Sequence, residues 1–129
     1  MNRKRILIVE DDASMRQVLV AQMKTNDYDA LPAADALTAL AQAQKLSSDP
    51  LLLDLGLPGG GGLNLMQRMQ SIPKLAVIPI IVISARAGSP IEREVLDKGA
   101  AAFFKKPIDF GELLKKIREL LGDASGKTV

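Results

Sequence analysis

The chain has 129 residues, 47% of them hydrophobic and 25% charged, which is typical of one ordinary globular domain. Its net charge of +2, with only three Phe and one Tyr, is too weak a signal to predict nucleic-acid binding. Because these residues include no histidine and no cysteine, they exclude Cys/His zinc sites, thiol nucleophiles and Ser–His–Asp triads. Any reaction at these residues must therefore depend on carboxylates, hydroxyls, amines, guanidinium groups and the backbone.

The first residues do not resemble a targeting signal. A basic start is followed by a short apolar run, residues 6–9, and then by acidic residues, so the apolar part is too short for a signal peptide. The longest apolar stretch, residues 75–83, is interrupted by Pro79 and is too short to span a bilayer. We therefore expect a soluble, cytoplasmic domain with no membrane partner.

Short apolar runs alternate with amphipathic stretches along the chain. Runs without period-two alternation are typical of strands buried on both faces, as in parallel sheets covered by helices. In chain order, strands are predicted at residues 6–9, 28–31, 51–53, 78–83 and 101–104. Helices are predicted from residue 14, at 35–44, at 63–70, at 90–98 and after Asp109. Five β–α units predict one α/β domain with right-handed crossovers.

Capping patterns mark the start of three of these helices. They are Ser14-x-x-Gln17, Ser89-Pro90-x-Glu92 and Asp109-x-x-Glu112. The last residues, 123–129, are polar and contain Gly and Ser. We expect residues 1–122 to form the domain and residues 123–129 to form a flexible C-terminal tail.

Polar side chains follow the apolar runs at the ends of four predicted strands. They are Glu10, Asp11, Asp54, Ser84 and Lys106, with Asp12 as a surplus acid that we expect to cap a helix. The carboxyl ends of parallel strands lie along one edge of the sheet, where open α/β folds bind their ligands. Each residue alone has an ordinary explanation, such as capping or solvation, but five of them on one rim predict a site.

The carboxylates of Glu10, Asp11 and Asp54, crowded together, favour a bound cation. Oxygen ligands without His or Cys are typical of a hard ion, Mg²⁺ before Mn²⁺ or Ca²⁺. Such an ion keeps open positions for a phosphoryl oxygen, and Lys106 and Ser84 would add a positive charge and a donor. These groups are what an aspartate needs to accept a phosphoryl group, with Asp54 as the nucleophile.

Four segments of the chain strongly resemble the receiver domain of two-component response regulators. The segments are residues 6–12, 51–59, 81–86 and 104–107, and the resemblance extends over residues 4–121. It implies a flavodoxin-like, doubly wound α/β domain, with a five-stranded parallel sheet of order 2-1-3-4-5 and five helices. It also implies a signalling phosphoacceptor, which catalyses only its own phosphorylation and dephosphorylation, with Mg²⁺ as cofactor.

The resemblance also implies a role for each rim residue. Asp54 would be the phosphoacceptor, and Ser84 and Lys106 would bind the phosphoryl group. The metal ligands would be Glu10, Asp11, Asp54 and the carbonyl of Gly56, with Glu10 acting mostly through water.

Two further positions are expected to take part in switching. Ser84 would turn toward the phosphoryl group, and Phe103 would rotate into the space that it leaves, although simple core packing explains a Phe equally well. Gly56 offers no side chain two residues after the acceptor, and Arg86 places a cation two residues after Ser84. Because both flank the place where water must attack, we hypothesise that they alter the lifetime of the phosphoryl group.

The expected partners follow from the same resemblance. A sensor histidine kinase or a histidine phosphotransfer protein would supply the phosphoryl group. The signal would pass through the fourth strand, the fourth helix and the fifth strand and helix to a downstream effector or output domain. No direct contact with nucleic acid is expected. A phosphorylation-dependent homodimer, and whether the chain acts alone or within a longer regulator, stay open.

The same residues bear on three other functions. A phosphatase of the haloacid dehalogenase type needs a second acid two residues after its nucleophile, where this chain has Gly56. A dinucleotide-binding module needs a glycine-rich turn after the first strand, where this chain has three acids. A degenerate receiver that binds partners without taking phosphate stays open, although the presence of all five rim residues argues against it.

Overall fold

The computed structural model describes residues 4–45, 49–85 and 89–122. Within these residues the strands are β1 Arg5–Val9, β2 Asp29–Ala33, β3 Leu51–Asp54, β4 Ile80–Ser84 and β5 Ala102–Lys105. The α-helices are α1 Ala13–Thr25, α2 Ala36–Ala43, α3 Gly61–Gln70, α4 Ser89–Asp97 and α5 Phe110–Leu121, and a short 3₁₀ helix, η1, covers Pro58–Gly60. All neighbouring strands are parallel and their order is β2-β1-β3-β4-β5, so the predicted fold class is confirmed.

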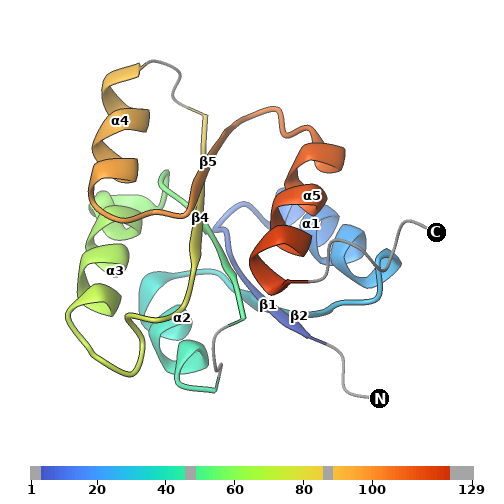
Figure 1. Cartoon of the computed structure of the whole chain (residues 1–129), viewed down its shortest axis with the longest axis horizontal. Helices are drawn as coiled ribbons and strands as arrows, with labels where there is room; N and C mark the ends of the chain where they lie inside the picture. The colour runs from blue at the N-terminus through green and yellow to red at the C-terminus, as the bar shows by residue number, and fades with distance from the viewer. Residues whose placement is uncertain (1–3, 46–48, 86–88, 123–129) are drawn as a thin grey trace.

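Helices cover both faces of the sheet. Figure 1 shows α2, α3 and α4 on one face and α1 and α5 on the other. Successive side chains of a strand point to opposite faces, and β1 follows this rule. Leu7 and Val9 pack on the α2–α4 side, while Ile6 and Ile8 pack on the α1–α5 side. Burial on both faces explains why the strand runs are continuously apolar.

The structure corrects one predicted helix cap and confirms two. The N-cap of α1 is Asp12, whose side chain accepts a hydrogen bond from the Ser14 backbone N–H at 3.0 Å, so Ser14 lies inside the first turn. The interpretation of Ser14-x-x-Gln17 as a capping box is therefore wrong, and the capping role expected for Asp12 is confirmed. Asp109 caps α5 as predicted, because its side chain accepts from the Glu112 N–H at 3.1 Å.

Strand boundaries differ from the prediction by one to two residues. β4 begins at Ile80 rather than at residue 78, because Pro79 has no N–H for the ladder and instead its carbonyl accepts from the Leu51 N–H at 2.9 Å. β2 contains Pro32, which an edge strand tolerates. The predicted tail, residues 123–129, lies outside the described residues. Among the helices that the structure describes, none is long and apolar enough to cross a membrane.

Candidate functional site

The carboxyl edge of the sheet brings the predicted rim residues together. Glu10 follows β1 directly, Asp54 and Ser84 are the last residues of β3 and β4, and Lys106 follows β5. With Asp11, they line one pocket of about 580 Å³, which Gly56 also lines. The pocket therefore contains every predicted metal-binding and phosphate-binding residue.

Lys106 lies between two buried carboxylates. Its Nζ is 3.0 Å from Oε1 of Glu10 and 3.4 Å from Oδ2 of Asp54, although the two acids are 96 and 52 positions away in the chain. Burial alone would lower the pKa of Lys106, but the hydrogen bond to Glu10 and the charges of Asp54 and Glu10 outweigh it and raise the pKa. Lys106 therefore stays charged and faces the pocket with its ammonium group.

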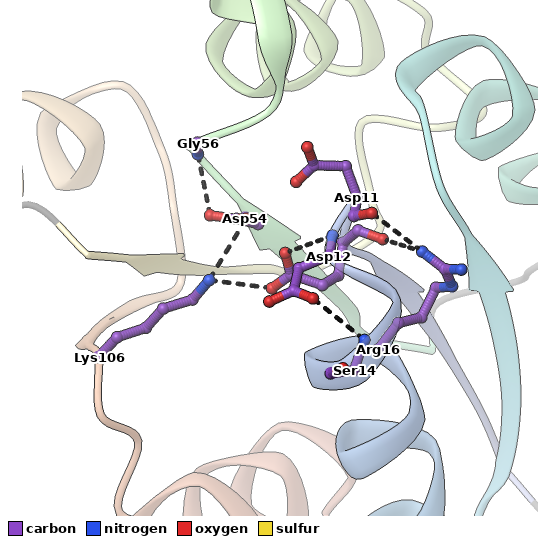
Figure 2. A network of polar contacts seen from close by, with 8 residues as sticks. Asp11, Asp12, Ser14, Arg16, Asp54, Gly56 and Lys106 are labelled. Carbon is purple, nitrogen blue, oxygen red and sulfur yellow. Dashed lines mark hydrogen bonds and ion pairs between the residues drawn. The ribbon is translucent and has the colours of Figure 1, made fainter.

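Backbone N–H groups hold the other oxygens of the two buried acids. The Asp12 N–H donates to Oε2 of Glu10 at 3.2 Å, and the Gly56 N–H donates to Oδ1 of Asp54 at 2.9 Å. Figure 2 shows the Asp54 carboxylate between Gly56 and Lys106. A charge-assisted hydrogen bond at each oxygen fixes the orientation of the carboxylate before any ligand binds.

The donor set fits a hard divalent cation. One carboxylate oxygen from each of Glu10, Asp11 and Asp54 lies within 4.8 Å of the others. Glu10 and Asp54 are buried and Asp11 is exposed, so the group opens to solvent on one side. Oxygen donors with an open side suit Mg²⁺, which keeps several waters in protein sites.

The positions beside Asp54 and Ser84 are only partly described. At Gly56 an added Cβ would lie 3.2 Å from Oδ1 of Asp54, so this position directly neighbours the Asp54 carboxylate. Arg86, the other predicted modulator, lies outside the described residues.

Ser84 and Phe103 share one face of the sheet. Phe103 is half-buried, packs against the α2–α4 cluster and pairs with Val82 across β4 and β5. Ser84, two residues after Val82 and only 2% exposed, has the same strand parity and lines the pocket. The packing expected for Phe103 is present, and its rotation stays a prediction.

The sequence reasoning missed Arg16. From the first turns of α1, its Nη1 donates to the Glu10 carbonyl at 2.8 Å and to the Asp11 carbonyl at 3.3 Å. Helical side chains lean toward the N-terminus of their helix, so a long cation four residues after the Asp12 cap can reach back to the preceding loop. That spacing is the signal that could have identified it.

Burial, together with the neighbouring Asp54 carboxyl, raises the pKa of Glu10 to about 7 against the opposing effects of Lys106 and the Asp12 N–H. Folded Glu10 therefore keeps its proton where the unfolded residue, with its usual pKa of 4.5, has lost it. By linkage, this group costs the folded state stability as pH rises through that window.

We predict that a Glu10→Gln variant gains stability relative to the wild type between pH 4.5 and pH 7, and that the difference is constant above pH 7. The reason is that glutamine has no proton to lose. Urea unfolding at a series of pH values, with a chelator present, measures the difference. A difference that does not change with pH would contradict the raised pKa.

Comparison with known proteins agrees with this geometry. The chain matches the response regulator receiver domain family over residues 6–118. It is 32% identical to the DNA-binding dual master transcriptional regulator RpaA of Synechocystis over 91% of this chain, and 34% identical to the response regulator PleD of Caulobacter vibrioides over 90%. The chain spans 48% of the length of RpaA and 26% of that of PleD.

A solved structure gives the same answer for the fold. The receiver domain of a sensor histidine kinase from Pseudomonas aeruginosa superposes with a TM-score of 0.83 at 26% identity, covering 94% of this chain and 99% of that one. Its active site cleft holds a coordinated magnesium ion. Because the family matches most of the length of this chain, the chain belongs to the response regulator receiver domain family, whose members act as phosphoacceptors in two-component signalling.

Proposed function

We propose that Asp54 accepts a phosphoryl group from a phosphohistidine on a partner protein, a sensor histidine kinase or a histidine phosphotransfer protein. The observation that carries the proposal is the position of the Asp54 carboxylate, buried in the pocket between the Lys106 ammonium and the acidic pair Glu10 and Asp11. None of the 129 residues is a histidine, so the imidazole that donates the phosphoryl group must come from outside them.

In the transfer, an Asp54 carboxylate oxygen attacks phosphorus and the bond from phosphorus to the donor nitrogen breaks. The electron pair of that bond goes to the imidazole, which takes up a proton as it leaves, and the product is an aspartyl phosphate. Lys106 is placed to pair with the phosphoryl oxygens, since its Nζ already lies 3.4 Å from Oδ2 of Asp54. The hydrolysis that returns Asp54 to its free form is proposed for the same site.

The groups that would hold Mg²⁺ are the carboxylates of Glu10, Asp11 and Asp54 and the carbonyl of Gly56. When bound, the ion supplies positive charge that offsets repulsion between these carboxylates and the oxygens of the incoming phosphoryl group. The buried pair of acids already has one cation in Lys106, whereas the exposed Asp11 adds a carboxylate that forms no ion pair among the described residues.

Phosphorylation would be transmitted through Ser84 and Phe103. Ser84 would bond the phosphoryl oxygens, and Phe103, on the same face, would move into the space that Ser84 leaves. This would reshape the surface of β4, α4, β5 and α5, which a downstream effector, an output domain or a second copy of the chain would read. We propose residues 1–122 as the extent of this signalling domain and the cytoplasm as its location.

Gly56 and Arg86 are proposed to set the lifetime of the phosphoryl group. A side chain at position 56 would begin 3.2 Å from Oδ1 of Asp54, where it would limit the approach of water. The dephosphorylation rate of a Gly56→Asn variant measures this effect.

The experiment that tests the proposal is phosphorylation by acetyl phosphate, a small donor, with and without Mg²⁺. We expect the intact mass to rise by one phosphoryl group only when Mg²⁺ is present, with the label in the peptide that contains Asp54. Phosphorylation that is unaffected by a chelator, or no phosphorylation under any condition, would overturn the proposal.

A further inference from the structure

The acidic residues of the site differ in how they are held. Glu10 is fixed at both carboxylate oxygens, by Lys106 and by the Asp12 N–H, and Asp54 is fixed at both of its oxygens, by Lys106 and by the Gly56 N–H. Among the described residues, no hydrogen bond or ion pair reaches the carboxylate of Asp11. The placement of Asp11 therefore depends on its backbone.

The backbone of Asp11 is held by Arg16. One guanidinium nitrogen of Arg16 bonds the carbonyls of Glu10 and Asp11 together, at 2.8 Å and 3.3 Å. Figure 2 shows the Asp11 carboxylate pointing away from the guanidinium group while its carbonyl faces it. Within the described parts of the chain, Arg16 forms no ion pair with a carboxylate, so its contacts with the site go through the loop backbone.

We propose that Arg16 is a positioning residue, which holds the β1–α1 loop so that the Asp11 carboxylate stays in reach of a cation shared with Glu10 and Asp54. The proposal rests on the proposed Mg²⁺ site. It is a geometric role, because Arg16 binds carbonyl groups on the side of the loop that faces away from the Asp11 carboxylate. Residues that orient a metal ligand typically contribute about 10-fold or more to metal affinity.

The sign of the effect separates this role from a purely electrostatic one. Removing a positive charge from the neighbourhood of an anionic site would, by Coulomb attraction alone, make Mg²⁺ bind more tightly. Loss of positioning makes it bind more weakly. A residue that only stabilised the fold would lower the unfolding midpoint and leave the Mg²⁺ affinity of the folded protein unchanged.

The test is Mg²⁺ titration of the unphosphorylated protein by calorimetry, for the wild type, Arg16→Met and Arg16→Lys. We expect Arg16→Met to bind Mg²⁺ about 10-fold more weakly, and Arg16→Lys, which retains a donor, to recover part of the loss. Lys24→Met, which removes a charge from the last turn of the same helix, is the control and keeps the wild-type affinity. Circular dichroism verifies that each variant is folded.

The outcomes are distinguishable. Equal or tighter binding by Arg16→Met overturns the positioning role while leaving the metal site intact. Should Arg16→Met not fold, Arg16→Lys decides the matter, because the positioning role predicts weaker Mg²⁺ binding in that variant too, and wild-type affinity would overturn it. Absence of Mg²⁺ binding in the wild type contradicts the metal site and the positioning role together.

Discussion

Asp54→Asn is expected to abolish phosphorylation by acetyl phosphate, to below the detection limit of intact-mass measurement. An amide oxygen is a far weaker nucleophile than a carboxylate oxygen, and the substitution removes one of the three negative charges proposed to bind Mg²⁺. The fold should survive, since the new side chain has the same shape and its oxygen can still accept from the Gly56 N–H. The loss would therefore be chemical and not structural.

The matched control for this variant is Asp12→Asn. It makes the same chemical change at an acid that also lines the pocket but caps α1 instead of belonging to the proposed ligand set. Asparagine is as good an N-cap as aspartate, so the helix is retained. We expect phosphorylation of Asp12→Asn to resemble that of the wild type. A full phosphoryl label on Asp54→Asn would mean that another residue is the acceptor.

The fold was predictable because burial on both faces leaves a strong mark in the sequence. Continuous apolar runs at residues 6–9 and 51–53 identify strands that are covered by helices, and polar residues directly after them must lie at one edge of a parallel sheet. This topological rule brings Lys106 and Glu10 together across 96 positions of the chain. The rule predicts which residues lie near one another but not the distances between their atoms. The contacts of Lys106 with both buried acids could therefore be seen only in the structure.

The wrong cap at Ser14 and the missed contact of Arg16 both depend on local geometry that the sequence does not give. Asp12 and Ser14 are both good N-caps, and only the backbone geometry decides that Asp12 occupies the position and Ser14 donates to it. Arg16 resembles any half-exposed helical cation in the sequence. Its partners are backbone carbonyls, which every residue has, so only its spacing from the Asp12 cap, and no pairing of residue types, could have indicated the contact.

The structure also explains why one position of the run of four glycines, residues 59–62, must be glycine. At Gly62, at the start of α3, an added Cβ would lie 2.7 Å from the Asp54 carbonyl oxygen and 2.8 Å from the Leu55 Cα. Both atoms belong to the backbone, so neither can move aside like the end of a flexible side chain. Only a glycine here lets α3 pack this closely against the segment that carries the proposed phosphoacceptor.

We therefore expect Gly62→Ala to lower the free energy of unfolding by about 1–2 kcal/mol, since the usual cost of overpacking exceeds what alanine contributes to a helix. The control is Gly61→Ala, one position earlier, where the nearest atom to an added Cβ is the Leu57 Cβ at an ordinary 3.5 Å. That variant should gain roughly 0.5 kcal/mol because alanine restricts the unfolded chain. Urea unfolding of both variants measures the difference. If Gly62→Ala were as stable as Gly61→Ala, the close approach of α3 to the Asp54 and Leu55 backbone would not restrict the residue at position 62.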